Sequence, residues 1–160
     1  VTVEKIILHK ERYRELEGNL LMFYLGDTRS ASTILKEQSS NIVSDSAKIE
    51  NTKKMVILAK DLKCELQKNN IDCIGEILHA GWLYKRELAS GISNERIDHF
   101  YDIGIKNGAS GGKLLGAGGG GFLLFYAKKE NQEKLRRAMD GLEEFNFSFD
   151  ESGTSIIYYN

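Results

Sequence analysis

The chain has 160 residues, of which 41% are hydrophobic and 28% charged, so it is long enough to form one domain with its own core. Its 22 basic and 23 acidic residues give a formal net charge of -1, which argues against a surface built to bind nucleic acid. Because Cys64 and Cys73 lack the spacing of a zinc or redox motif, and neither a bilayer-spanning run nor a signal peptide is recognisable, we expect a cytoplasmic protein.

The amino-terminal part predicts two strands around a short helix. Residues 1–8 are β-branched and roughly alternating, which is typical of a strand, and residues 9–18 indicate a short charged helix that ends at glycine. The apolar run "LLMFYLG", residues 20–26, predicts a buried strand. Since the chain starts with Val1 on a segment that looks like the end of a strand arrangement, we expect it to be a piece of a longer polypeptide.

Four helices are predicted next. Asp27 or Thr28 can cap the first, and the last has Asn94 as its N-cap and Gly108 just past its end. The second carries apolar residues at helical spacing: Ile49, Val56, Ala59, Leu62 and Leu66. The four helices begin near residue 30 and at about 45, 71 and 95, and the last three end near 68, 88 and 107.

The carboxyl-terminal part predicts strand, glycine turn, strand, a helix over 131–142, and two strands over 145–149 and 154–159. The order of elements indicates an α+β fold in which helices pack on one face of an antiparallel sheet. No repeat, low-complexity tract or internal linker divides the chain, so we expect residues 1–160 to be a single domain.

The stretch "GASGGKLLGAGGGGFLLFYA", residues 108–127, concentrates backbone freedom in one place, because nine of the sixteen glycines lie between Gly104 and Gly121. Glycine inside an element costs roughly 0.5–1 kcal/mol relative to alanine, so the cluster needs a compensating use. A dinucleotide fingerprint should open a helix, whereas a strand follows here, and a P-loop fails at Asn107 and Leu114. The residues alone leave two interpretations open: a loop that cradles an anion, and a hairpin turn.

The segment "GGKLLGAGGGGF", residues 111–122, resembles the third conserved motif of the GHMP kinases, the superfamily named for galactokinase, homoserine kinase, mevalonate kinase and phosphomevalonate kinase. Within it, "GDTRSASTILKEQ", "WLYKRELASGISN" and "SIIYY" are similar to the carboxyl half of D-glycero-D-manno-heptose 7-phosphate kinases. Many members of the superfamily have Thr or Ser at the position of Leu115, so a hydroxyl that relatives use is absent here.

The resemblance implies a ferredoxin-like sheet extended by extra helices, forming the carboxyl-terminal half of a two-domain kinase. ATP and Mg²⁺ would bind mainly to an amino-terminal domain, whose own loop and acidic residue are not found in this chain, so we expect no catalytic residue here and no turnover by the chain alone. The loop implied to lie near the phosphates consists of Gly116, Ala117, Gly118, Gly119, Gly120 and Gly121. A non-catalytic ferredoxin-like module that binds a ligand or regulates a partner is the alternative.

Arg29 is the first candidate for binding the sugar phosphate. It lies at the start of a predicted helix, where the macrodipole disfavours a cation unless an anion sits between them. The amides of the helix terminus and the guanidinium would both favour phosphate. The structural alternatives for Arg29 are that it reaches solvent, or that it pairs with Asp27 or a nearby glutamate.

Lys85, Lys113 and Ser93 are the other substrate candidates. Lys85 falls near the centre of an apolar helical stripe, so it bends out along apolar surface or points into a cleft at the helix end. Lys113 belongs to the glycine-rich motif itself. Ser93 and Asn94 offer hydrogen bonds that suit a sugar, and they equally suit a helix cap.

Overall fold

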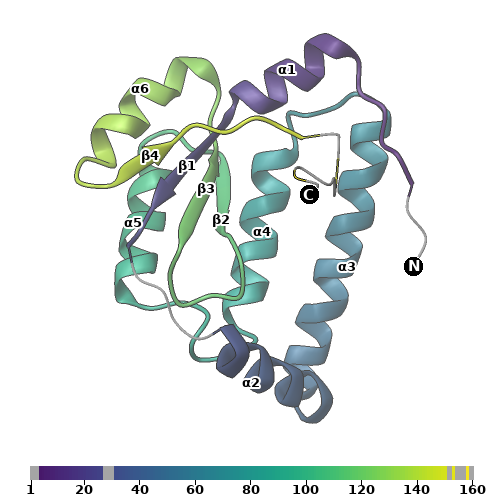
Figure 1. The fold of residues 1–160 in the computed structure, drawn as a ribbon. Coiled ribbons are helices and arrows are strands. Elements are labelled where there is room, and N and C mark those ends of the chain that lie inside the picture. The colour runs from purple at the N-terminus through teal and green to yellow at the C-terminus, as the bar shows by residue number, and fades with distance from the viewer. Residues whose placement is uncertain (1–3, 27–30, 151–152, 154–157, 159–160) are drawn as a thin grey trace.

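A computed structural model describes residues 4–26, 31–150, 153 and 158. In this part of the chain an antiparallel sheet of four strands lies beside six helices (Figure 1). Along the chain the elements are α1 (Lys10–Gly18), β1 (Leu20–Tyr24), α2 (Ala31–Ser44), α3 (Ser46–Gln67), α4 (Ile74–Arg86), α5 (Glu95–Lys106), β2 (Gly111–Leu114), β3 (Phe122–Tyr126), α6 (Lys129–Ala138) and β4 (Glu143–Phe145).

The sheet has the strand order β2-β3-β1-β4, and every neighbouring pair is antiparallel. β1 lies in the middle, with Leu20 opposite Tyr126 of β3. β2 and β3 form the hairpin predicted around the glycine-rich segment. The expected α+β fold with an antiparallel sheet is confirmed.

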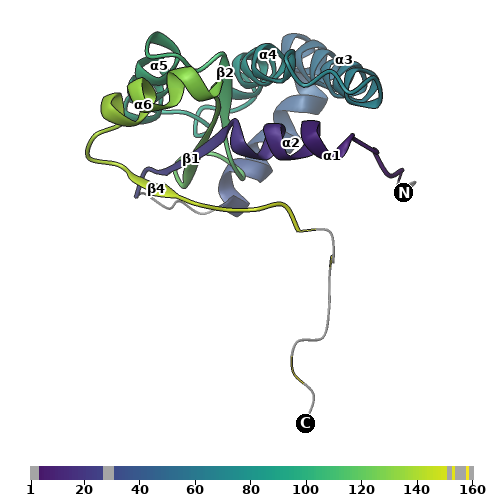
Figure 2. The ribbon, with the colours of Figure 1, turned by 90° about the horizontal axis from the view of Figure 1, so that it is seen from above.

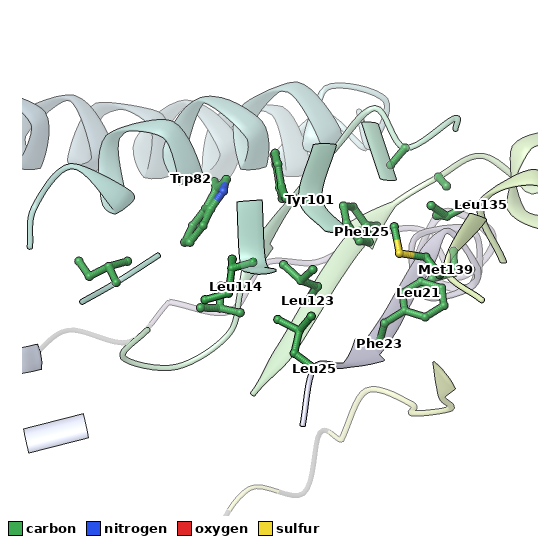
Figure 3. Close-up of a cluster of buried hydrophobic side chains, with 14 of the residues drawn as sticks. Leu21, Phe23, Leu25, Trp82, Tyr101, Leu114, Leu123, Phe125, Leu135 and Met139 are labelled. Carbon is green, nitrogen blue, oxygen red and sulfur yellow. The ribbon is translucent and has the colours of Figure 1, made fainter. Parts of the chain in front are cut away.

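One face of the sheet forms the core because its strands alternate. Leu21 and Phe23 of β1 and Leu123 and Phe125 of β3 are buried on this face. Helices α4, α5 and α6 lie in a layer over it (Figure 2), and Trp82 of α4, Tyr101 of α5 and Leu135 of α6 join the same buried cluster (Figure 3). The helices therefore cover one face of the sheet, as predicted.

Helix α3 lies beside α4 at the edge of this layer and packs on it (Figures 1 and 2). Its start is set by Asp45, whose side chain accepts hydrogen bonds from the amides of Ala47 and Lys48. Leu62 and Leu66 pack against Ile71 and Ile74, but Val56, which has the helical spacing of an apolar stripe, is 50% exposed. No residue of α3 is fully buried, so its apolar side is only partly covered.

Predictions for the helix starts and ends were accurate where capping is local. Asn94 accepts a hydrogen bond from the amide of Ile97 at 3.0 Å, and Gly108 follows α5 with a φ of 109°, as expected. α4 begins at Ile74, three residues later than predicted, because residues 71–73 form a turn. α6 begins and ends earlier than predicted, at Lys129 and Ala138.

The predictions for the strands at the two ends of the chain were wrong where the structure tests them. Residues 4–9 form no strand, because this segment runs beside α3 and α4: Lys63 pairs with Glu4, and Leu8 packs near Ile71. Strand β4 ends at Phe145, and residues 146–150 form no strand. Of the last predicted strand, residues 154–157 and 159 lie outside the described residues.

None of the helices in the described ranges is long and apolar enough to cross a membrane.

Candidate functional site

The glycine-rich loop, residues 116–121, joins β2 to β3 at the lower end of the sheet in Figure 1, near α2. Gly116, Gly118 and Gly119 have φ angles of 84°, 124° and 78°, a conformation that residues with a side chain rarely adopt. The amide of Leu115 donates to the carbonyl oxygen of Phe122 at 2.8 Å and closes the loop. The turn itself therefore accounts for part of the glycine content.

Two backbone hydrogen bonds fix the loop to the rest of the domain. The amide of Gly119 donates to the carbonyl oxygen of Ile92 at 2.9 Å, and the amide of Leu25 donates to that of Gly121 at 2.8 Å. A Cβ atom on Gly118 would lie 2.6 Å from the Cα atom of Ile92, so only glycine allows this close approach. The loop is thus held between the end of β1 and the connection from α4 to α5.

Several amides of the loop remain available to a ligand. Within residues 4–26 and 31–150, the amides of Ala117, Gly118 and Gly120 donate to no protein acceptor, whereas that of Gly119 is used by Ile92. Successive amides in a turn can form a concave site for an anion. The proposed contact of the loop with phosphates stays a prediction, with Gly119 contributing no amide to it.

Lys85 reaches the loop from the end of α4. Its Nζ atom donates to the carbonyl oxygen of Gly116 at 2.6 Å. Burial lowers the pKa of the Lys85 amine, and the positive charge of Lys113 lowers it further. Two directions were open for Lys85: out along apolar surface, or toward the end of its helix. In the structure the side chain takes the second direction, and its amine meets the glycine loop.

Lys113 lies on β2, next to Leu114 in sequence but on the opposite face of the strand, and is half-buried. Neither Lys113 nor Lys85 forms an ion pair with any of the described residues. Two neighbouring cations without a carboxylate partner create a local positive potential that favours an anion. The structure thus brings together three of the predicted features: Lys85, Lys113 and the loop.

Ser93 and Asn94 both act at the start of α5. The hydroxyl of Ser93 donates to Oδ1 of Asp98 at 2.6 Å, and Asn94 is the N-cap. Asn94 therefore has the capping role that the sequence allowed, whereas the hydrogen bond of the Ser93 hydroxyl goes to the side chain of Asp98 and not to a backbone amide. A contact of Ser93 with substrate would use its oxygen as an acceptor and stays a prediction.

Arg29 lies outside the described residues, so its predicted role is untested. The elements on either side of it border the loop region. Leu25, before it, donates to Gly121, as described. Ile34 of α2, after it, packs close to Gly91: a Cβ atom added to Gly91 would lie 3.3 Å from Cγ1 of Ile34.

Sequence reasoning missed the connection between α4 and α5 as a support for the loop. Ile92 acts through its main-chain carbonyl, 27 residues before Gly119 in the chain, and a backbone acceptor has no residue-type signal. The same connection is fixed at Ser90, whose amide and hydroxyl donate to Glu37 and lower the pKa of that carboxyl. In the described residues, no group of three or more His, Cys, Asp or Glu side chains is arranged to hold a metal.

Comparison with known proteins agrees with this arrangement. Residues 62–142 match the family described as GHMP kinases C terminal. A bifunctional fucokinase/GDP-fucose pyrophosphorylase of Arabidopsis thaliana is 34% identical over 134 residues, which are 82% of this chain and 13% of that protein. A D-glycero-alpha-D-manno-heptose 7-phosphate kinase of Campylobacter jejuni is 30% identical over 142 residues, 87% of this chain and 41% of that protein.

Among solved structures, L. major mevalonate kinase in complex with R-mevalonate has a TM-score of 0.67, with 15% identity over 78% of this chain and 40% of that one. This likeness shows the fold alone. The chain spans less than half the length of these relatives. The family match covers the helices α4 and α5, the hairpin and the glycine loop, and on that match the chain belongs to the GHMP kinase C-terminal family.

Proposed function

We propose that the chain is the carboxyl-terminal half of an ATP-dependent kinase that transfers the γ-phosphoryl group to a hydroxyl of a heptose 7-phosphate. One observation carries this proposal: the amides of Ala117, Gly118 and Gly120, which donate to none of the described residues, lie in one loop with the carbonyl that Lys85 binds, and Lys113 adds a second cation without an ion pair among those residues. Donors and positive charge gathered at one edge suit an anion that must be held in a defined position.

Phosphoryl transfer needs positioning and charge neutralisation more than covalent participation of the protein. The loop amides would donate to phosphate oxygens, and Lys113 would reduce the negative charge that repels the acceptor hydroxyl. Lys85 would act as a positioning residue, because its hydrogen bond to Gly116 fixes one end of the loop while Ile92 fixes Gly119.

ATP and Mg²⁺ are the cofactors of this proposal. The loop amides fit the phosphate part of ATP. A Mg²⁺ ion would take its protein ligands from an amino-terminal domain of the same polypeptide, together with the acidic residue that lies near the acceptor hydroxyl. The free Cys64 and Cys73 are compatible with work in the cytoplasm.

The heptose 7-phosphate is supported by the kinase of Campylobacter jejuni, and Arg29 is the candidate for its phosphate. The fucokinase of Arabidopsis thaliana supports a second candidate substrate, a sugar without a phosphate group. Heptose 7-phosphate requires a cation that binds the sugar's own phosphate, whereas fucose does not.

The experiment uses the full-length enzyme with ATP and Mg²⁺ and compares heptose 7-phosphate with fucose. Arg29→Ala should raise KM for heptose 7-phosphate roughly tenfold to hundredfold, since a charged hydrogen bond contributes about 1.5–3 kcal/mol, while KM for ATP stays unchanged. Turnover of fucose but not of heptose 7-phosphate would replace the first substrate with the second. No phosphoryl transfer to any sugar would favour the non-catalytic module.

A further inference from the structure

A groove of about 230 Å³ runs between α3 and α4. Its walls are apolar, and Lys85 and Lys113 line it as well. The apolar lining comes mainly from Met55, Leu58, Leu62, Leu78, Gly81 and Trp82.

The groove exists because two helices meet without filling the space between them. Gly81 faces α3, and a Cβ atom placed on it would contact only Cδ1 of Leu58, at 3.9 Å. No residue of α3 is fully buried, so the apolar side chains around the groove stay partly in contact with water. Apolar surface left open in this way is favourable for binding an apolar body.

The polar groups of the groove favour an anion. Lys85 and Lys113 have no ion-pair partner among the described residues, and burial, followed by the positive charge of Lys113, lowers the pKa of Lys85. Trp82 is 1% exposed, and its Nε1 atom has no acceptor in the part of the chain that the structure describes. The groove therefore has two lysines without an ion-pair partner among the described residues, and Trp82, which also lines it, carries a buried donor whose hydrogen bond is unmade.

We propose that this groove binds an amphiphilic anion, with the apolar body between α3 and α4 and the anionic group at Lys85 and Lys113. A sugar phosphate has the anionic group but no apolar body to cover Leu58, Leu62 and Leu78, so the groove does not fit the proposed substrate. Its volume lies below the roughly 300–1,000 Å³ of pockets for drug-sized ligands, which restricts the body to a short chain or a single ring.

The chain contains one tryptophan, so the fluorescence of Trp82 reports directly on the groove. The probe is octanoate, kept below its micelle concentration, with octan-1-ol and octyltrimethylammonium as controls that have the same tail. We expect a saturable change with octanoate, an affinity for the alcohol that is roughly tenfold to hundredfold weaker, and no saturation with the cation. An equal response to all three probes, or no saturable response to octanoate, overturns the proposal.

Variants of the chain locate the site. Gly81→Leu fills the groove and should abolish octanoate binding, and Lys113→Met should weaken it about tenfold or more. Lys129→Met, on the exposed start of α6, is the matched control and should bind octanoate as the parent chain does. Octanoate binding that is unaffected by both Gly81→Leu and Lys113→Met would place the ligand elsewhere and refute the proposal.

If Gly81→Leu does not fold, Leu58→Ala gives the converse test. Removing this side chain enlarges the groove, so the preference should shift from octanoate toward the longer decanoate, and an unchanged preference would contradict the proposed site. The assay contains neither ATP nor sugar. Its outcome is therefore independent of the proposed kinase activity, and either proposal can fail while the other stands.

Discussion

The variants Gly118→Ala and Gly116→Ala distinguish two reasons for glycine in the loop: close packing against neighbouring atoms, and a backbone conformation that disfavours a side chain. Both glycines have positive φ angles, 124° and 84°. A Cβ atom on Gly118 would lie 2.6 Å from Cα and 2.9 Å from the carbonyl oxygen of Ile92, whereas on Gly116 it would meet nothing within 4 Å. The two substitutions share the conformational cost and differ in the clash.

The conformational cost of an alanine at positive φ is about 1–2 kcal/mol, which both variants should show. Gly118→Ala adds overpacking against main-chain atoms that cannot rotate away, which costs typically 1–3 kcal/mol more. It should also weaken the neighbouring hydrogen bond from Gly119 to Ile92. We therefore expect the free energy of unfolding to fall further in Gly118→Ala than in Gly116→Ala by at least about 1 kcal/mol.

The assay is urea unfolding of the 160-residue chain and the two variants, followed by circular dichroism, with Tm measured on the same samples. A difference of 1 kcal/mol corresponds to about 2–4 °C in Tm for a domain of 150–250 residues. Equal destabilisation by the two alanines would refute the conclusion that the loop is packed against Ile92.

Two other substitutions test the helices that support the site. Gly81→Ala should raise the free energy of unfolding by up to about 1 kcal/mol, because alanine favours the helix and its Cβ atom has room. Gly75→Ala should lower the free energy of unfolding, because its Cβ atom would collide with Ser110, just before β2. Denaturation curves that rank the two variants in the opposite order would contradict the packing described for α4. Because the pKa of Lys85 is lowered in the folded state, the unfolded chain binds more protons between that lowered pKa and the usual 10.5, so the free energy of unfolding should gain a component that rises with pH in this range. Lys85→Met should lack that component, and identical pH profiles for the two proteins would show that Lys85 is not desolvated.

The sequence predicts the elements best where the signals are local. The hairpin of β2 and β3 follows from two apolar segments around the glycines, and α5 follows from Asn94 and Gly108. These signals depend on residues adjacent in the chain, so no knowledge of tertiary contacts is needed.

Predictions failed where distant contacts decide. Alternating β-branched residues favour a strand but do not specify an edge to pair with. The segment from Glu4 pairs with Lys63 and runs along α3 instead of joining the sheet, while β4 follows β1 only from Met22 to Tyr24.

The candidate site shows the same division. The helical spacing placed Lys85 on the apolar stripe of its helix, because a helix fixes the direction of each side chain, but it left two directions open: out along apolar surface, or into a cleft at the helix end. Its acceptor, the carbonyl of Gly116, lies 31 residues away and belongs to the backbone, so it could not be predicted from residue types.

The central claim is that the glycine loop binds a phosphoryl group as well as forming a turn. The most direct measurement is kcat and Tm of Gly120→Ala in the full-length enzyme, because the Gly120 amide has no acceptor within the described ranges. Gly141→Ala is the control outside the loop, since Gly141 also has a positive φ, of 89°, has nothing within 4 Å of an added Cβ atom and lies in the turn before β4. We expect Gly120→Ala to lower kcat by an order of magnitude or more, since a displacement near 1 Å can cost about a hundredfold, while Gly141→Ala leaves kcat unchanged. Full activity of Gly120→Ala with a lowered Tm would show that the glycines serve the turn alone and would contradict the claim.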